Sequence, residues 1–208
     1  MKNYLAPRIR DILFGGVFIA VLFLGPKMLN PDGDLPRHLL MGKIIIEKQS
    51  VPTTDIFSHV YLGQSLIPHE WLSGVIFYIS YLFFDLNGVV LVSAFLLATT
   101  FTIVYEYIII QSKVRIMALL VVLLAIALSS LHWITRPHLF TMLFLAIYLI
   151  LTDKLNRDEV KHIWPFPFLM LIWANLHAEF IAGFLILGAY VAGWLLETLF
   201  SAIKPGWA

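Results

Sequence analysis

The chain contains no cysteine and little charge. None of its 208 residues is Cys, and only 13% are Asp, Glu, Lys or Arg, whereas soluble domains carry roughly 25% charged residues. The lack of cysteine excludes a disulfide framework, thiolate chemistry and a cysteine-ligated metal. In place of charge the chain has apolar residues, which make up 60% of it, and its mean hydropathy is +0.87. These values indicate an integral membrane protein.

The apolar residues occur in long runs, which predict an all-α, polytopic membrane helix bundle. A helix needs about 20 residues to cross a bilayer, and the runs lack the alternation of barrel strands. We expect a single transmembrane domain over residues 1–208 with about six crossings. The first run is predicted to be a retained helix and not a signal peptide, because no small-residue cleavage pattern follows it. The expected crossings are Ile12–Leu29, Gly88–Ile110, Arg115–Leu131, His138–Leu151, Ile163–Leu176 and Phe180–Phe200.

The positions of Lys and Arg predict how the chain is threaded through the membrane. If the short apolar stretch Trp71–Phe84 does not cross, nine basic residues share one side, which the positive-inside rule places in the cytoplasm. We therefore expect Trp71–Phe84 to lie in or dip into the outer interface. It would belong to a large first outer loop over residues 30–87 that carries interfacial helices. The nine residues are Lys2, Arg8, Arg10, Lys113, Arg115, Lys154, Arg157, Lys161 and Lys204.

This topology, chosen on Lys and Arg alone, also gathers polar segments on one face. The first loop and the segments 132–138 and 173–179 would all reach the outside of the plasma membrane, with the N-terminus in the cytoplasm. Ionisable residues at membrane depth are functional candidates by default. We therefore expect the active face to be the outer one.

Three carboxylates of the first loop are the candidate catalytic residues. Asp32 and Asp34 form a D-x-D pair, which can bind a divalent cation such as Mg²⁺ or Mn²⁺ through oxygen ligands. Alternatively, one of them acts as a general base. A purely local interpretation also exists, because Asp34 is a good N-cap and Asp32-Gly33 favours a turn. Glu70 would complete the carboxylate cluster, or it is favoured by the dipole of the helix that begins at Trp71.

Two arginines and several neutral polar residues are candidates for binding a phosphorylated substrate. Arg37 and Arg136 carry guanidinium groups suited to phosphate; alternatively Arg37 reaches lipid headgroups, and Arg136 contacts a headgroup or Glu179. The segment that holds Asn175 is also consistent with an ordinary helix–turn–helix connection. The other candidates for substrate contacts are His38, His69, His138, Asn175 and His177.

Taken together, these segments resemble a known family. The matching stretches are Asn30-Pro31-Asp32-Gly33-Asp34 with His38 and Gly42, Val51–Ser58, His69-Glu70-Trp71-Leu72, Arg136-Pro137-His138 and Trp173-Ala174-Asn175-Leu176-His177. In order and spacing they resemble the N-terminal part of the C-type (GT-C) integral-membrane glycosyltransferases. The resemblance is to the bacterial proteins related to protein O-mannosyltransferases and aminoarabinose transferases.

The resemblance implies a function. Such enzymes are inverting and transfer a sugar from a polyprenyl-phosphate carrier to an acceptor on the outer face. It implies that Asp32 or Asp34 is the catalytic base or a metal ligand, and that Arg136 contacts the phosphate. The expected partners are a polyprenyl-phosphate-linked sugar and membrane lipid, with no nucleic acid and an open choice of acceptor. Two features depart from the family: Leu35-Pro36-Arg37 lacks an aromatic residue before the histidine, and the chain is short, which predicts an N-terminal portion.

Two other functions fit the composition. The protein is alternatively a non-catalytic membrane subunit that binds a lipid-linked glycan, or a transporter. A transporter is expected to place polar groups near mid-membrane, often on broken helices, whereas the expected crossings here carry almost none. The sequence therefore favours chemistry or headgroup binding at one face.

Overall fold

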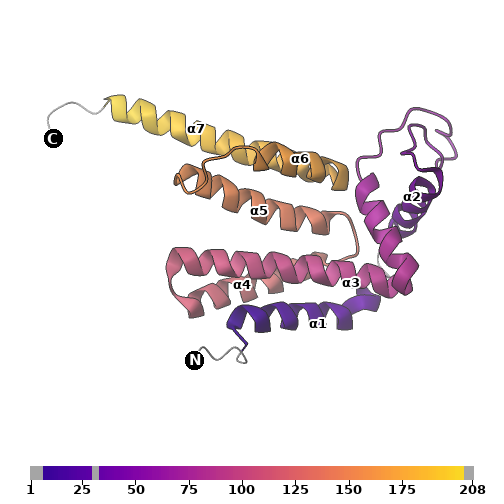
Figure 1. Cartoon of the computed structure of the whole chain (residues 1–208), viewed down its shortest axis with the longest axis horizontal. Helices are drawn as coiled ribbons and strands as arrows, with labels where there is room; N and C mark the ends of the chain where they lie inside the picture. The colour runs from indigo at the N-terminus through magenta and orange to yellow at the C-terminus, as the bar shows by residue number, and fades with distance from the viewer. Residues whose placement is uncertain (1–6, 30–32, 204–208) are drawn as a thin grey trace.

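The computed structural model describes residues 7–29 and 33–203, with side chains described up to residue 200. Over these residues it contains seven α-helices and two single-turn 3-10 helices, and its only β pairing is an isolated antiparallel bridge between Thr54 and Ser65. The predicted all-α polytopic bundle is therefore confirmed (Figure 1). The helices are α1 (Ile9–Leu29), α2 (Leu35–Lys48), α3 (Trp71–Ser112), α4 (Arg115–Ser129), η1 (Ser130–His132), α5 (His138–Asn156), α6 (Pro165–Leu176), η2 (Ala178–Phe180) and α7 (Ile181–Ile203).

By length and composition, five stretches of the described chain are suited to cross a membrane. They are Ile9–Leu29, Trp71–Ser112, Arg115–His132, His138–Asn156 and Ala178–Phe200. The remaining expected crossing, Ile163–Leu176, is helical only from Pro165 and has 12 residues. At 1.5 Å per residue it is about 18 Å long, shorter than the roughly 30 Å hydrocarbon core. The proline near its start fixes where this helix begins, and a polar turn ends it.

Helix α3 changes direction where the sequence predicts two separate helices. Phe84 (φ −142°, ψ 21°) and Asp85 (φ 50°, ψ −145°) leave the helical region of backbone space. The part before this break, Trp71–Phe84, lies across the end of the bundle, whereas the part after it runs along the bundle axis (Figure 1). A Cβ on Gly88 would lie 2.0 Å from the Ser80 carbonyl oxygen, so only glycine permits this close approach. This is the arrangement expected of an interfacial helix followed by a crossing.

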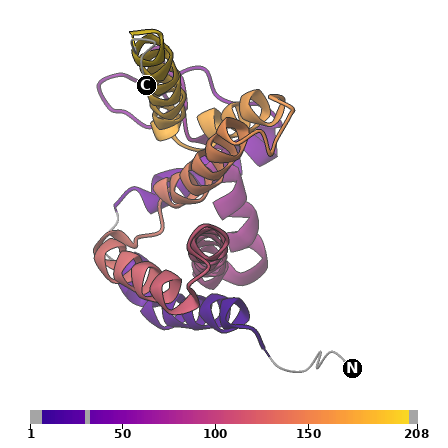
Figure 2. The ribbon, with the colours of Figure 1, turned by 90° about the vertical axis from the view of Figure 1, so that its left-hand side faces the viewer.

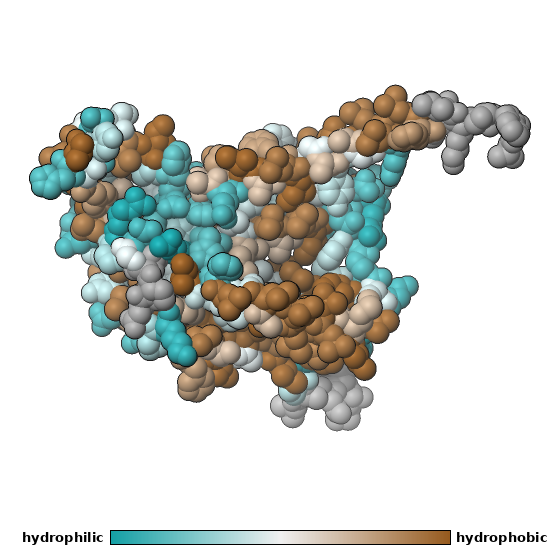
Figure 3. All heavy atoms as spheres, turned by 180° about the vertical axis from the view of Figure 1, so that it is seen from behind, coloured by the Kyte–Doolittle hydropathy of each residue, from teal (hydrophilic) through white to brown (hydrophobic). Residues whose placement is uncertain are grey.

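The bundle is layered around the long part of α3. Helices α1, α2, α4 and α5 all contact α3, and α7 packs on α5; viewed along the bundle, α7 lies on the opposite side from α1 (Figure 2). The core between the layers includes Val21, Leu97 and Leu139, each fully buried. Apolar side chains also cover the outer surface of the long helices (Figure 3), as expected of helices that face lipid.

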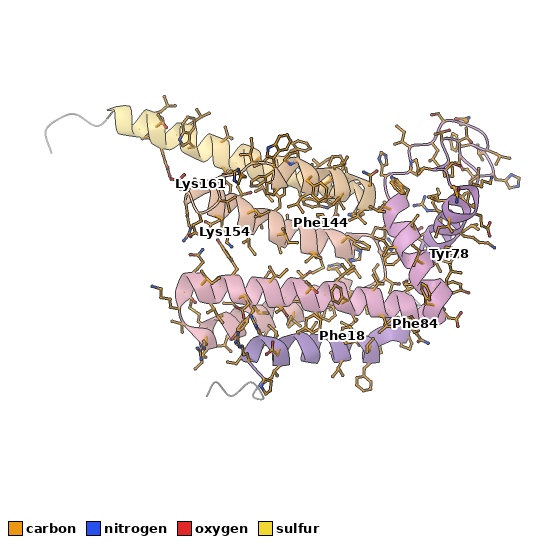
Figure 4. All side chains as sticks on the ribbon, in the orientation of Figure 1. Phe18, Tyr78, Phe84, Phe144, Lys154 and Lys161 are labelled. Carbon is orange, nitrogen blue, oxygen red and sulfur yellow. The ribbon has the colours of Figure 1, made fainter. Side chains whose placement is uncertain are left out.

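The two ends of the bundle differ in charge. One end carries α2 and the loops before α3, after α4 and after α6, and we call it the α2 end. The other, which we call the terminal end, carries the basic residues expected to share one side, among them the labelled Lys154 and Lys161 (Figure 4). The described basic residues at the terminal end are Arg8, Arg10, Lys113, Arg115, Lys154, Arg157 and Lys161.

Candidate functional site

Polar side chains from four separate parts of the chain meet at the α2 end. Helix α2, the start of α3, the loop before α5 and the turn after α6 each contribute to one cluster around a cavity of about 550 Å³, which we call the bundle cavity. Hydrophilic residues gather over this end of the surface (Figure 3). We call the group the Glu70 cluster; it consists of Asp34, Arg37, His38, Glu70, Arg136 and His177.

Glu70 is the centre of this cluster. Its Oε1 lies 3.3 Å from His177 Nε2, and its Oε2 lies 3.8 Å from both Arg37 and His38 Nε2. The Glu70 side chain is 25% exposed. These separations are longer than the 2.7–3.2 Å of a direct hydrogen bond. The carboxylate is therefore surrounded by cationic and imidazole groups but keeps acceptor capacity for a further ligand.

Asp34 and Arg136 form the second ion pair of the cluster. A carboxylate oxygen of Asp34 lies 3.1 Å from a guanidinium nitrogen of Arg136, and both side chains are partly exposed. Asp34 is the N-cap residue of α2, but its side chain makes no capping hydrogen bond. The predicted position of Asp34 as the N-cap is therefore confirmed, but its carboxylate faces the arginine and does not cap the helix. Glu179, the alternative partner considered for Arg136, lies 3.3 Å from His177 Nδ1.

Two buried residues, Thr141 and Trp173, support the Nδ1 side of the His177 ring. The Trp173 indole N–H donates to Thr141 Oγ1 at 2.9 Å, and Thr141 Oγ1 lies 2.9 Å from His177 Nδ1. Trp173 is fully buried, whereas the His177 side chain is 14% exposed. The ring is thus anchored in the bundle while its Nε2 faces Glu70.

The bundle cavity has both polar and apolar lining. Its apolar lining includes Met142 and Leu145 of α5, one and two turns beyond His138. His138, Thr141, Met142 and Leu145 recur at the spacing of one helix face, so a single face of α5 supplies both polar and apolar lining. Such a cavity suits a ligand with a charged head and a hydrocarbon chain.

A second cavity, of about 810 Å³, lies between α2 and the loop that precedes α3. We call it the loop cavity. Its lining includes Asp55, whose carboxylate accepts hydrogen bonds from the backbone N–H groups of Phe57 (2.8 Å) and Ser58 (2.9 Å). The bonds from Ser58 and Phe57 lower the pKa of Asp55 from its ordinary value, because they favour the ionised form. Arg37, His38 and Glu70 line both cavities and so form the wall between them.

The structure brings most of the expected site residues together. Asp34, Arg37, His38, Glu70, Arg136, His138 and His177 all line the bundle cavity. His69 lines only the loop cavity. Asn175 accepts a hydrogen bond from the Trp71 indole at 2.6 Å and donates to the Leu171 carbonyl at 2.7 Å, so its amide joins α3 to α6 and does not face either cavity.

The cation site expected at Asp32 and Asp34 involves a residue outside the described chain, since residues 30–32 are not described. Within the described residues, no group of three His, Asp or Glu side chains is placed to share a metal ion. A divalent cation at this pair stays a prediction.

Sequence reasoning missed Thr141, Trp173, Met142 and Leu145 as parts of the site. Thr141 lies three positions after His138, and Leu145 seven positions after it, so the helical spacing from a candidate histidine is the signal that would have found them. Trp173 lies four positions before His177, so the same spacing applies to it, but a tryptophan among apolar residues also looks like ordinary core.

Comparison with protein-family models, with curated proteins and with solved structures gives no match to this chain. The resemblance to C-type glycosyltransferases stays a prediction from the residues quoted above.

Proposed function

We propose that the protein is a membrane glycosyltransferase that moves a sugar from a polyprenyl-phosphate-linked donor to an acceptor on the outer face of the plasma membrane. The observation that carries this proposal is the position of Glu70 in the wall between two cavities. A group-transfer enzyme must hold its two substrates next to one another, so a carboxylate that lines both cavities is placed where donor and acceptor would meet. Among the carboxylates of the described chain that line either cavity, Glu70 alone lines both: Asp34 and Glu179 line the bundle cavity, and Asp55 lines the loop cavity.

The bundle cavity suits the donor. Its lining includes Arg136, a guanidinium suited to phosphate, and Met142 and Leu145, which suit the start of a prenyl chain. Asp34 competes with a phosphate for Arg136, since the two side chains are paired at 3.1 Å. Donor binding therefore replaces a carboxylate by a phosphate at the same guanidinium.

The proposed reaction uses Glu70 as the general base. The Glu70 carboxylate takes the proton of an acceptor hydroxyl from the loop cavity, and the acceptor oxygen forms a bond to the anomeric carbon of the sugar. The bond between that carbon and the phosphate oxygen breaks, and the departing lipid phosphate keeps the electron pair. Arg136 stabilises the charge that develops on this phosphate, a contribution that is often the largest in such sites.

The test separates binding from chemistry in protein reconstituted in nanodiscs. We expect the wild type to bind a polyprenyl phosphate, and Arg136→Ala to bind it at least about tenfold more weakly, because a hydrogen bond to a charged group contributes roughly 1.5–3 kcal/mol. Glu70→Gln should bind like wild type and transfer sugar about 10²–10⁴-fold more slowly, the usual contribution of a general base. A panel of polyprenyl-phosphate sugars identifies the donor.

Arg115→Ala is the matched control, because Arg115 is an exposed arginine at the terminal end. Its binding should equal that of wild type. No binding by the wild type, or equal loss in Arg115→Ala and Arg136→Ala, would contradict the proposal. Full transfer by Glu70→Gln would remove Glu70 from the mechanism.

One observation favours a second function, that of a non-catalytic subunit that binds a lipid-linked glycan. Two of the three carboxylates at the bundle cavity, Asp34 and Glu70, already lie beside cationic groups, as in a site that only binds. In that case Arg136→Ala weakens binding as above, and no donor in the panel supports transfer.

A further inference from the structure

A chain of polar contacts runs from the buried core to Glu70. The Trp173 indole N–H donates to Thr141 Oγ1 at 2.9 Å, Thr141 Oγ1 is hydrogen-bonded to His177 Nδ1 at 2.9 Å, and His177 Nε2 faces Glu70 Oε1 at 3.3 Å. Its members come from α5, α6, the turn after α6 and the residue before α3. The first two members are buried, so water does not compete with them.

The direction of each donor in this chain follows from the chemistry of the groups. An indole N–H only donates, so Thr141 Oγ1 accepts from Trp173. The hydroxyl then has one proton to give, and among the described residues the only acceptor within hydrogen-bond range of it is His177 Nδ1. Nδ1 therefore accepts, and in the neutral ring the proton sits on Nε2.

The position of Glu70 agrees with this direction. Nε2 lies 3.3 Å from the Glu70 carboxylate, and an ionised carboxylate only accepts. An unprotonated Nε2 would turn a lone pair toward that negative charge, whereas an Nε2–H turns its positive end toward it. Glu179 lies 3.3 Å from Nδ1, but Thr141 is closer, and the Glu179 side chain is 61% exposed, so water screens its effect.

We propose that Thr141 and Trp173 are positioning residues that fix His177 in the Nε2–H tautomer, so that the ring holds one Glu70 oxygen in place in the wall between the two cavities. The role of Glu70 in transfer rests on the proposed function, but the tautomer does not. If Glu70 is the base, a fixed Nε2–H leaves Oε2 as the oxygen that faces the acceptor. Loss of the Thr141 hydroxyl would then lower the rate of sugar transfer.

The test measures the tautomer directly. The full chain in detergent micelles, labelled with ¹⁵N in its histidine rings, gives separate signals for protonated and unprotonated ring nitrogens, and His177→Gln assigns the signals of His177. In the wild type we expect Nε2 protonated and Nδ1 unprotonated. Thr141→Val keeps the shape of the side chain but removes the hydroxyl, and should shift the ratio of tautomers toward Nδ1–H by about fivefold, the equivalent of one ordinary hydrogen bond.

Two further variants control for a structural effect. Thr141→Ser keeps the hydroxyl and should keep the wild-type signals, and Trp173→Phe should shift the ratio in the same direction as Thr141→Val by a smaller factor. A wild type with the proton on Nδ1 would overturn the proposal, as would unchanged ring signals in Thr141→Val. A correct tautomer with no sugar transfer by any donor would contradict the proposed function and leave this inference standing.

Discussion

A largely covered carboxylate lies at each end of the bundle, Asp153 at the terminal end and Glu70 at the α2 end, and the two are satisfied in different ways. At the terminal end, a single oxygen of Asp153 accepts from Tyr107, from Gln111 at 3.2 Å and from Arg157 at 2.9 Å. At the α2 end, the contacts of Glu70 lie at 3.3–3.8 Å and are divided between its two oxygens. One oxygen of the first carboxylate takes three close contacts, whereas the contacts of the second carboxylate are longer.

The difference teaches how to tell a structural polar group from a functional one in a membrane bundle. The partners of Asp153 lie on α3 and at the end of α5, and Arg157 also donates to Gln111 at 2.6 Å, so this group joins two packed helices. The partners of Glu70 come from loops and from α2, and they surround cavities. Longer contacts that are divided between both oxygens beside a cavity, and not charge alone, mark the candidate site.

The largest expected effect comes from separating α2 from α3. A Cβ on Gly42 would lie 2.1 Å from the Gly74 carbonyl oxygen, so Gly42→Ala must move a backbone. We expect a loss of about 1–3 kcal/mol in the free energy of unfolding and loss of lipid-phosphate binding, because α2 carries Arg37 and His38. Thermal unfolding in detergent measures the first effect. Gly188→Ala is the control, since its Cβ meets nothing within 4 Å, and equal behaviour of the two variants would contradict the close contact.

The second prediction concerns Asp153, the carboxylate at the terminal end. Asp153→Asn should lower the free energy of unfolding by about 1–3 kcal/mol, because it weakens several hydrogen bonds to a charged acceptor, and should leave lipid-phosphate binding unchanged. Thermal unfolding and a binding titration on the same sample measure both. A binding defect in a stable Asp153→Asn protein would show that the terminal end also belongs to the site.

In contrast to Asp153→Asn, Asp34→Asn is expected to change binding more than stability. The Asp34 side chain is 53% exposed, so its pair with Arg136 adds at most about 1 kcal/mol to stability. Removing its charge leaves Arg136 more available to a phosphate, and we expect polyprenyl phosphate to bind a few-fold more tightly. Weaker binding by Asp34→Asn would mean that this carboxylate contacts the donor and does not compete with it.

A smaller effect is expected at the link between α3 and α6. Trp71→Phe removes the indole N–H that donates to Asn175 at 2.6 Å, which should cost about 1 kcal/mol of stability and disturb the turn that carries His177. The exposed Trp194 (61%) provides the matched control, since Trp194→Phe removes the same group without a buried partner. The difference between the unfolding midpoints of the two variants measures the contribution of the Trp71–Asn175 hydrogen bond, and identical midpoints would contradict it.

The smallest expected effect is a local pH dependence of the loop cavity. The backbone N–H groups of Ser58 and Phe57 lower the pKa of Asp55, so the turn is stabilised above the unfolded-state value of about 3.9. That stabilisation is lost as the pH falls through the lower pKa of the folded state. The amide shifts of Phe57 and Ser58 should therefore titrate below about pH 3.9. They should not titrate in Asp55→Asn; a midpoint above the ordinary value would contradict the turn.

The sequence predicted the helices well because their signals are local. Hydropathy and run length located five of the expected crossings, and the charge argument separated Trp71–Phe84 from Gly88–Ile110 at the place where Phe84 and Asp85 break α3. The length of α6 was overestimated, since apolar character continues before Pro165 although the helix does not. The side of the membrane that each end faces stays a prediction.

The pairs within the site were not predictable from the sequence in the same way. The sequence named Asp34, Glu70, Arg136 and His177 as candidates, but it assigned Glu179 as the alternative partner of Arg136 and gave Asn175 a substrate contact. In the structure Arg136 forms an ion pair with Asp34, and Asn175 accepts a hydrogen bond from Trp71. Thr141 and Trp173 were absent from the candidates because their importance depends only on what lies beside them.

The sequence by itself determined a polytopic helical membrane protein and the set of polar residues at one end of it. It could do so because a backbone in lipid must satisfy its own hydrogen bonds, which makes apolar runs helical whatever their neighbours are. Only the tertiary structure decided that Glu70 lies between two cavities, that Asp34 faces Arg136, and that Trp173 and Thr141 support His177. Those contacts join segments that are distant in the chain. They depend on the break in α3 and on the close approach of α2 to α3 at Gly42 and Gly74. Side-chain packing sets both features, and no local sequence pattern encodes them.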